Sequence, residues 1–152
     1  MEEKNYDCLK LANQICFPLY AASKEMIKRY KPFLDKLDLT YTQYITMMVL
    51  WEKKQMNVKE LGQFLFLDSG TLTPVLKKLE AKRYITRARM QKDERNVLVC
   101  ITAEGERLKE KASLIPGRMA ECVCLDENDA RTLYALLYKV LNGFKESRGD
   151  EE

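Results

Sequence analysis

Histidine is absent from this chain of 152 residues. It is the usual general base, the usual switch at physiological pH and the commonest metal ligand in proteins. Its absence excludes catalysis by Ser-His and Cys-His pairs. We therefore predict a protein that is not an enzyme and that holds neither a metal ion nor a cofactor.

Long apolar runs are also missing. The longest, from Tyr44 to Trp51, contains Thr46 and is far shorter than the roughly 20 apolar residues of a membrane-spanning helix. The first residues lack the basic and apolar parts of a signal peptide. We expect a cytoplasmic protein without a membrane partner, whose five cysteines are reduced thiols.

The charge of the chain is nearly balanced, at +3, but it is unevenly distributed. The segment from Ser69 to Arg95 carries eight basic against three acidic residues, a net of +5, while the remainder carries −2. A basic segment on a mildly acidic protein is typical of phosphate binding. A solvated surface with randomly clustered charge is the alternative interpretation.

Apolar residues repeat at spacings of three and four from Leu9 to Tyr30, which predicts a long helix with a seam for a partner helix. Pro18 interrupts this helix, because it cannot donate to the carbonyl of Gln14 and costs about 3 kcal/mol in a regular helix. The helix is therefore kinked near Cys16, or it restarts there with Pro18 in its first turn. We expect Pro32 to end it.

The middle of the chain predicts a helix-turn-helix. Thr40 begins a helix that runs to about Glu52, Asn57 begins one over 58–65, and Asp68 or Ser69 begins one that ends at Arg83. In such a motif the second helix enters the major groove of DNA. Its apolar side is Leu72, Val75, Leu76 and Leu79. Its outward residues, which we expect to contact DNA, are Ser69, Thr71, Thr73, Lys77 and Lys78.

A basic β-hairpin is predicted next, from two β-rich runs over 84–90 and 95–101 around a charged tip over 91–94. A hairpin that follows a helix-turn-helix is a wing. We expect Arg87, Arg89 and Lys92 to contact phosphates, which position a protein without specifying sequence. Arg95 and Asp93 form either further DNA contacts or an ion pair that braces the wing.

The predicted fold class is mainly α with a small antiparallel β wing, in one compact unit. Residues 1–35 form an N-terminal dimerisation region, 36–102 a winged helix-turn-helix, and 103–152 C-terminal dimerisation helices. Thr102 begins a helix that Pro116 and Gly117 break, and Asp126 begins the last. Both ends carry apolar seams, so we expect a two-fold homodimer on double-stranded DNA. Its operator would be a pseudopalindrome with half-sites about one helical turn apart.

This order of elements resembles the MarR family of bacterial repressors. The resemblance rests on two segments. One is Asp93-x-Arg95. The other begins with Leu61-Gly62, continues with Asp68-Ser69-Gly70-Thr71-Leu72-Thr73-Pro74 and ends at Glu80. It is similar in particular to the OhrR branch, which senses organic hydroperoxides, and it covers about Leu11 to Leu141. Further matches are Asn13-Gln14-x-Cys16-Phe17, Leu19-Tyr20-Ala21, Tyr30-Lys31-Pro32, Leu34-Asp35-Lys36-Leu37, Trp51-Glu52, Leu108-Lys109-Glu110-Lys111-Ala112 and Ile115-Pro116-Gly117. Pro18 departs from the family pattern.

The resemblance implies a redox-sensing repressor. An organic hydroperoxide would oxidise Cys16, and the repressor would then leave its operator. Tyr20 and Tyr30 would hydrogen-bond the Cys16 thiolate, and Arg95 would enter the minor groove while Asp93 positions it. Cys122 or Cys124 of the partner would turn the sulfenic acid into an intersubunit disulfide. A low-molecular-weight or protein thiol is the alternative to these two cysteines.

Several simpler interpretations stand beside this one. Cys16 lies on an apolar seam, where an inert buried cysteine is common, and Tyr20 and Tyr30 fit ordinary interface aromatics. Cys122-x-Cys124 is also half of a soft-metal site, which Cys16 or Cys100 would complete. Cys16 and Tyr30 are 14 residues apart, about 21 Å along one helix. Tyr30 therefore reaches Cys16 only from a second copy or after a severe bend.

Two alternative functions follow. One is a MarR-type repressor that a small aromatic ligand releases from DNA. The other is a thiol peroxidase or disulfide-exchange enzyme, against which the missing Cys-x-x-Cys motif argues.

Overall fold

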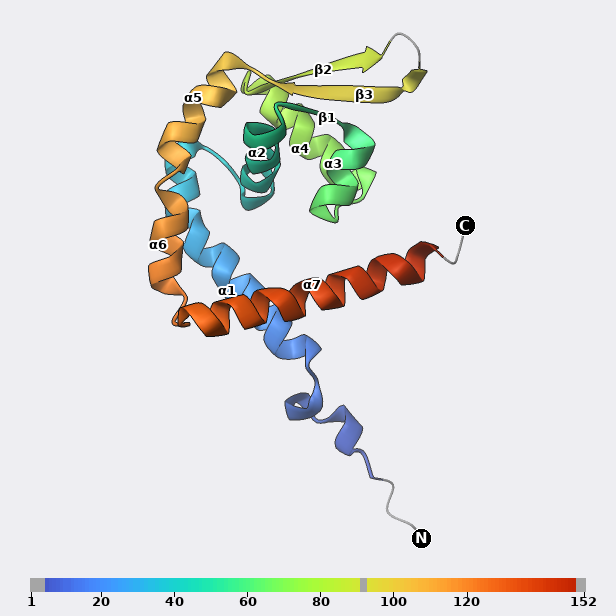
Figure 1. The fold of residues 1–152 in the computed structure, drawn as a ribbon, viewed down its shortest axis with the longest axis vertical. Helices are drawn as coiled ribbons and strands as arrows, with labels where there is room; N and C mark the ends of the chain where they lie inside the picture. Colours follow the sequence, from blue (N-terminus) through green and yellow to red (C-terminus); the bar gives the residue numbers. More distant parts are fainter. Residues whose placement is uncertain (1–4, 91–92, 150–152) are drawn as a thin grey trace. The chain divides into compact units, whose positions relative to one another are not determined.

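The computed structural model describes the backbone of residues 5–90 and 93–149 and the side chains of 5–89 and 97–144. The chain divides into two compact units, Met1–Pro116 and Gly117–Glu152. Figure 1 shows the elements in chain order. No helix within the described ranges is long and apolar enough to cross a membrane.

The first unit is a helical domain with a small sheet. Its elements are the 3-10 helices η1 (Asp7–Leu9), η2 (Leu11–Asn13) and η3 (Asp35–Leu37), the helices α1 (Cys16–Leu34), α2 (Tyr41–Lys53), α3 (Val58–Leu65), α4 (Ser69–Ala81) and α5 (Ala103–Ala112), and the strands β1 (Gln55–Asn57), β2 (Ile85–Met90) and β3 (Asp93–Ile101). Helix α6 (Ile115–Cys122) spans the boundary between the units, and α7 (Glu127–Gly149) belongs to the second.

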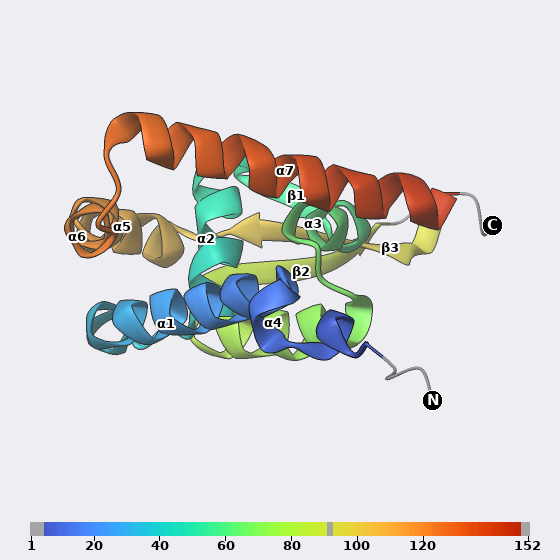
Figure 2. The same ribbon diagram turned by 90° about the horizontal axis from the view of Figure 1, so that it is seen from below.

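The sheet has the order β1-β3-β2 and is antiparallel throughout. Val99 of β3 lies opposite Met56 on one side and Arg87 on the other. The β2–β3 pair is the predicted hairpin, with an irregularity between Arg89 and Met90. It lies alongside α3 and α4 (Figure 2). Strand β1 was not predicted.

Five of the predicted helix starts are confirmed by their caps. A backbone N–H of the first turn donates to the capping side chain in α2, α3, α4, α5 and α7, whose caps are Thr40, Asn57, Asp68, Thr102 and Asp126. Such caps stabilise a helix by about 1 kcal/mol each. Of the two candidates for the start of α4, the structure selects Asp68, whose carboxylate lies 2.8 Å from the Thr71 nitrogen.

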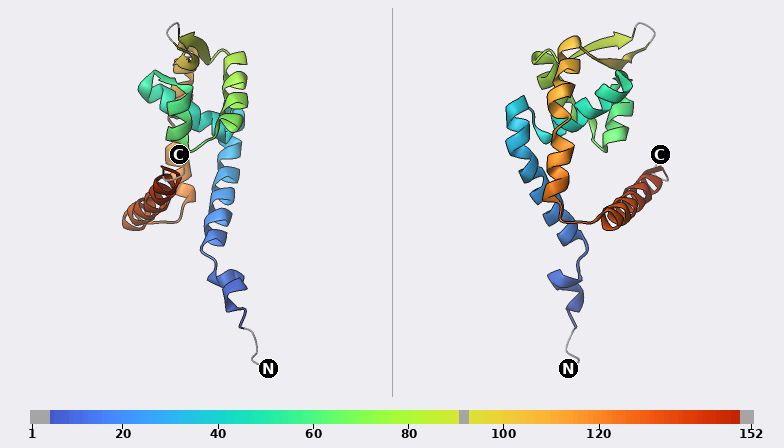
Figure 3. Two further views of the ribbon diagram at one scale, coloured as in Figure 1. Left: turned by 90° about the vertical axis from the view of Figure 1, so that its right-hand side faces the viewer. Right: turned by 60° about the vertical axis from the view of Figure 1, so that its left-hand side comes forward.

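The N-terminal helix begins later than its apolar repeat predicted. The described residues before Cys16, 5–15, form only η1 and η2, and α1 then runs unbroken to Leu34 (Figure 3). The restart at Cys16 with Pro18 in the first turn is therefore confirmed, because proline loses no intrahelical hydrogen bond there. The expectation that Pro32 ends the helix is wrong. Pro32 lies in the last turn, where it removes only one hydrogen bond.

Two further helix ends differ from the prediction. Helix α4 ends at Ala81 rather than Arg83, because Arg83 has a left-handed backbone with φ 62°. Helix α5 ends at Ala112, and Pro116 and Gly117 lie in the first turn of α6. Proline is well tolerated in a first turn, so this pair marks the start of a helix rather than a break.

The core of the first unit lies between the helices α2 to α4 and the sheet. Its most completely buried apolar side chains are Leu34, Met47, Leu50, Leu61, Leu72, Leu76, Leu79, Ile85 and Val99. Fully burying a side chain of this size contributes roughly 1.5–3 kcal/mol. The core therefore fixes how α4 packs against α2, α3 and β2, which it contacts.

A hydrogen-bonded junction ties α5 to this core. The indole N–H of Trp51 donates to the carbonyl of Gly105 at 2.8 Å. The Thr102 hydroxyl donates to the carbonyl of Arg83 at 2.6 Å, and the Thr102 N–H donates to that of Tyr84. A Cβ at Gly105 would overlap the Tyr84 carbonyl. The backbones of Gly105 and Tyr84 therefore lie too close together for any residue with a side chain at position 105.

We predict that Gly105→Ala destabilises the fold, by about 1–3 kcal/mol or more, because the added methyl group must displace backbone. Gly117→Ala is the matched control, since nothing lies within 4 Å of its added Cβ. Urea unfolding of the two variants and the wild type measures the difference. Equal stability of all three proteins would contradict the tight junction.

Candidate nucleic-acid interface and thiol site

The turn between α3 and α4 depends on a close approach at Gly62. A Cβ at this position would lie 2.8 Å from the carbonyl oxygen of Leu67, and the Leu67 N–H donates to the Gly62 carbonyl. Phe66 adopts a left-handed backbone with φ 55°. Three residues therefore connect α3 to α4, which Asp68 caps, as in a helix-turn-helix.

Helix α4 has one buried and one exposed face, as predicted. Leu72, Leu76 and Leu79 are buried, and Val75 is half-buried. Among the predicted DNA contacts, Thr73 is half-buried. The exposed ones are Ser69, Thr71, Lys77 and Lys78. This face presents two hydroxyl groups and two ammonium groups, which suit base edges and phosphates.

The start of α4 is held by Asp68. Its carboxylate accepts both the backbone N–H and the hydroxyl of Thr71, at 2.8 and 3.0 Å. These hydrogen bonds hold the pKa of the Asp68 carboxyl below its usual value. The Thr71 hydroxyl proton is thus engaged within the chain, while its oxygen remains able to accept.

The predicted wing residues divide into three groups. Arg89 is exposed on β2, as a phosphate contact requires. Arg87 is held by Glu80 of α4, with its Nε 2.9 Å from the Glu80 carboxylate, and sequence analysis missed this partner. Lys92 and the side chains of Asp93 and Arg95 lie outside the described residues.

The predicted sensor, Cys16, is the first residue of α1 and is exposed. Tyr20 follows one turn later on the same face and is 63% exposed, with the Lys24 ammonium 5.9 Å from its ring centre. The single chain therefore does not bury Cys16 in a core. Cys122 and Cys124 are also exposed thiols.

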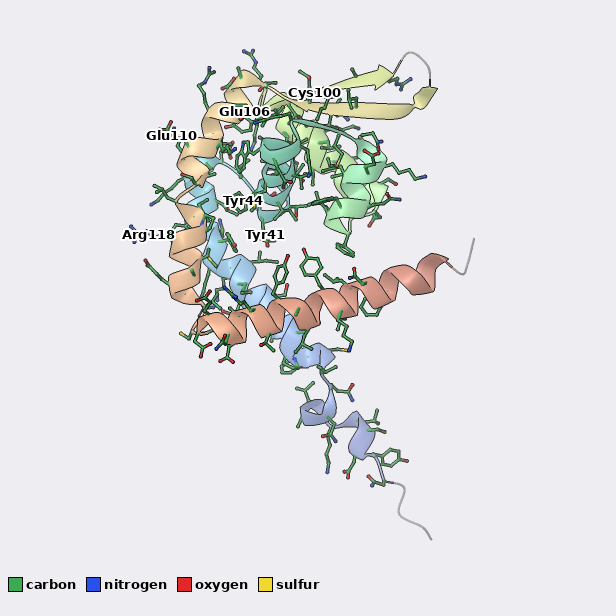
Figure 4. The ribbon with its side chains drawn as sticks, viewed as in Figure 1. Tyr41, Tyr44, Cys100, Glu106, Glu110 and Arg118 are labelled. Carbon is green, nitrogen blue, oxygen red and sulfur yellow. The ribbon has the colours of Figure 1, made fainter. Side chains whose placement is uncertain are left out.

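Tyr30 lies far from Cys16, against its own α2. Its ring centre is 4.9 Å from that of Tyr41 and 5.8 Å from that of Tyr44, both of which project from α2 (Figure 4). Tyr44 in turn lies 6.2 Å from Trp51. Because α1 is continuous between Cys16 and Tyr30, no bend within one chain brings the two together.

The tyrosine cluster, defined as Tyr30, Tyr41 and Tyr44, keeps its hydroxyl protons. Burial raises the pKa of Tyr30 and of Tyr41, and it raises the pKa of Tyr44 to about 12. Each hydroxyl is a hydrogen-bond donor at neutral pH, as that of an ordinary tyrosine is. Tyr30 and Tyr41 are half-buried, whereas Tyr44 is buried. Of these three tyrosines only Tyr30 was predicted to have a role; Tyr44 was counted in the longest apolar run, and Tyr41 was not singled out.

Metal binding receives no support from this geometry. Within the described ranges, no group of three or more His, Cys, Asp or Glu side chains is gathered closely enough to hold an ion. The Cys100 thiol instead lies 3.7 Å from the side-chain oxygen of Gln55, across the β1–β3 pair.

Comparison with known proteins gives the family. The family model of the SarA/Rot transcriptional regulators matches residues 28–112. The organic hydroperoxide resistance transcriptional regulator of Bacillus subtilis strain 168 is 49% identical over 139 residues, which make up 91% of this chain and 95% of that protein. The chain belongs to the SarA/Rot family of transcriptional regulators.

Solved structures of SarA/Rot- and MarR-type regulators share the fold. Reduced AbfR bound to DNA, a Staphylococcus epidermidis protein, gives a TM-score of 0.75 at 30% identity over 91% of this chain and 96% of that one. A cysteine-to-serine mutant of Escherichia coli MarR with operator DNA gives a TM-score of 0.77 at 25% identity, over 87% of this chain and 99% of that one. The predicted winged-helix fold and the resemblance to the MarR family and its hydroperoxide branch are confirmed.

The relatives also bear on the predicted absence of enzymatic activity. The matching family model and the Bacillus subtilis relative both describe transcriptional regulators rather than enzymes. This confirms the prediction drawn from the missing histidine.

We predict that the free energy of unfolding falls between pH 10 and about 12. Unfolded tyrosine ionises near pH 10, whereas folded Tyr44 stays protonated until about 12. A raised folded-state pKa contributes stability that is fully present below the unfolded pKa and is lost as pH rises through the folded one. Tyr44→Phe removes this contribution, so its fall over this range should be smaller in urea unfolding from pH 8 to pH 12. An identical fall in wild type and variant would contradict the burial of the Tyr44 hydroxyl.

Proposed function

We propose that the chain is a DNA-binding repressor that senses organic hydroperoxides through Cys16 and then releases its operator. The observation that carries this proposal is the exposed Cys16 thiol at the start of α1, in a chain 49% identical to an organic hydroperoxide resistance regulator. Cysteine reactivity follows exposure and thiolate character, so an exposed thiol suits a redox sensor.

DNA would be bound by α4 and the wing. Ser69, Thr71, Thr73, Lys77 and Lys78 would lie in the major groove of double-stranded DNA, and Arg89 and Lys92 would contact phosphates. Arg95 would enter the minor groove, with Asp93 positioning it. The relatives AbfR and E. coli MarR, both solved on DNA, support this assignment. Arg87 is left out of these contacts, because its side chain donates to Glu80.

The active form would be a homodimer on a pseudopalindromic operator. The N-terminal segment exposes Leu9 by 75% and Ile15 by 82%, and α7 exposes Leu136 by 56% and Phe144 by 62%. Exposed apolar patches of this kind mark protein interfaces. We propose that 1–35 and 103–152 supply the dimer contacts and 36–102 binds DNA.

A second copy would also complete the thiol site. Tyr30 lies about 21 Å along α1 from the Cys16 of its own chain, so only the partner's Tyr30 would reach that thiolate. Tyr20, one turn from Cys16, would donate from the same chain. Protonated tyrosine hydroxyls would stabilise the thiolate and orient it toward the peroxide.

The redox step would begin with attack of the Cys16 thiolate on the peroxide. An S–O bond forms, the O–O bond breaks and the alcohol leaves with a proton, so that Cys16 becomes a sulfenic acid. A second thiol then attacks this sulfur, a disulfide forms and water leaves. Cys122 or Cys124 of the partner would supply that thiol, or else a low-molecular-weight or protein thiol.

Disulfide formation, rather than further oxidation, would release the DNA. AbfR has been solved in an overoxidised form bound to DNA and separately in a disulfide form. This pattern supports a disulfide as the state that shifts the dimer interface and changes the spacing of the two recognition helices.

We predict that Cys16→Ser binds operator DNA like the wild type but is not released by cumene hydroperoxide, because serine forms no sulfenic acid. Cys100→Ser is the matched control and should be released normally. Electrophoretic mobility shifts with the protein's own promoter region measure both. Release of Cys16→Ser at the wild-type oxidant dose would refute the sensor. Retention of the wild type would favour release by a small aromatic ligand instead.

We further predict that peroxide converts the wild type into a disulfide-linked dimer, and that Cys122→Ser or Cys124→Ser, but not both, prevents this. Non-reducing electrophoresis and mass spectrometry of the linked peptides identify the resolving cysteine. If both single variants still form the dimer and the double variant does not, either thiol serves. Dimer formation in the double variant would exclude both.

A further inference from the structure

Arg87, near the base of the wing, is bound by Glu80, which lies in the last turns of the recognition helix α4. The Arg87 side chain donates from Nε at 2.9 Å and from a terminal nitrogen at 2.6 Å, both to Oε2 of Glu80. The backbone N–H of Arg87 donates to Oε1 at 3.1 Å. Both carboxylate oxygens are therefore engaged by one residue of the neighbouring strand.

This pair differs from an ordinary surface ion pair. The exposed fractions of the two side chains are 25% for Arg87 and 37% for Glu80, against 71% and 57% for the Lys31–Asp35 pair within α1. Fully exposed pairs contribute little, whereas shielded charge-assisted hydrogen bonds with fixed geometry contribute more. The Arg87 guanidinium also lowers the pKa of the Glu80 carboxyl, so Glu80 stays ionised at neutral pH.

The pair lies at a point on β2 where it can influence the position of the rest of the wing. Arg87 pairs with Val99 of β3, and β2 continues to Met90. Three residues of strand span about 10 Å, so a change in the direction of β2 at Arg87 displaces the end of the strand. Hydrogen bonds depend steeply on distance and angle, so such a displacement would weaken contacts between the wing and DNA.

We propose that Glu80 and Arg87 form a clasp that positions the wing relative to the recognition helix, and that Arg87 supports DNA binding through this clasp rather than by contacting a phosphate. This inference rests on the proposed binding of DNA by α4 and the wing. Glu80 and Arg87 are positioning residues in this account. The clasp replaces the phosphate contact that sequence analysis assigned to Arg87.

Whether one substitution raises or lowers the affinity for DNA distinguishes the clasp from simple electrostatics. A carboxylate near DNA repels phosphates, so its removal should strengthen binding if charge alone matters. If the clasp positions the wing, Glu80→Ala should instead weaken binding by about tenfold, comparable to the loss of one base contact. Glu60→Ala, an exposed acidic residue on α3, is the matched control and should bind as well as the wild type or better.

The salt dependence separates the two roles of Arg87. Replacing a residue that contacts a phosphate lowers the slope of log affinity against log salt by about 0.9. Arg87→Gln should weaken binding about as much as Glu80→Ala with an unchanged slope. Lys77→Gln, from the exposed face of α4, should lower the slope. Because the two clasp residues act as a unit, the double variant Glu80→Ala/Arg87→Gln should be no weaker than either single variant.

A shortened duplex tests whether the loss acts through the wing. The probes are the protein's own promoter duplex and a version cut back to the major-groove half-sites mapped by footprinting. The clasp variants should lose affinity on the long duplex and match the wild type on the short one. Equal losses of affinity on both duplexes would mean that the pair only stabilises the fold, and they would overturn the proposal.

The failures of the two proposals are distinguishable. Absence of specific binding by the wild type would overturn the proposed function. A wild type that binds, beside a Glu80→Ala variant that binds equally or more tightly, would overturn the clasp alone. If Glu80→Ala does not fold by circular dichroism, the slope of Arg87→Gln decides, since a slope lower by about 0.9 marks a phosphate contact.

Discussion

Burial of the leucines on α4 is the constraint on which the winged helix depends. Leu72, Leu76 and Leu79 are 0–1% exposed, and together they contribute several kcal/mol at roughly 1.5–3 kcal/mol each. With that face held in the core, the opposite face and its lysines must lie outward. Gly62 permits the close turn that delivers α4 to this position. The candidate DNA face is thus a consequence of packing.

The same core connects the two ends of the recognition helix to the rest of the unit. Asp68 fixes the start of α4, and Lys82, just beyond its end, forms an ion pair with Asp38 at 3.0 Å. Thr102 binds the Arg83 carbonyl, and Glu80 holds the wing through Arg87. These contacts link α4 and the residues just after it to η3, to the wing and to the start of α5.

The proposed thiol site is not held together by the packing of one chain, because one chain supplies its parts at separate places. Cys16 is exposed at one end of α1, and Tyr30 packs against Tyr41 and Tyr44 near the other end. A second copy with the reverse orientation would bring these parts together and would also cover the exposed apolar residues. A sensor that depends on the dimer interface is well placed to change the geometry of that interface on oxidation.

Sequence reasoning succeeded where the chemistry is local and failed where it depends on the fold. The caps at Thr40, Asn57, Asp68 and Thr102 act within one turn, so they were predictable. Strand β1 has only three residues and exists because it pairs with β3, which lies far along the chain. The Glu80–Arg87 pair and the tyrosine cluster required the packing of one element on another, which no periodicity reveals. The expectation that Pro32 ends the first helix was wrong because the effect of a proline depends on its distance from the end of the helix.

The most direct measurement follows DNA release and Cys16 chemistry in one sample. Reduced protein on fluorescent promoter DNA is titrated with cumene hydroperoxide, while mass spectrometry reports the fraction of Cys16 in a disulfide. The account predicts that the anisotropy of the DNA falls in proportion to that fraction, and that dithiothreitol restores both. Complete conversion of Cys16 to a disulfide with the DNA still bound would contradict it.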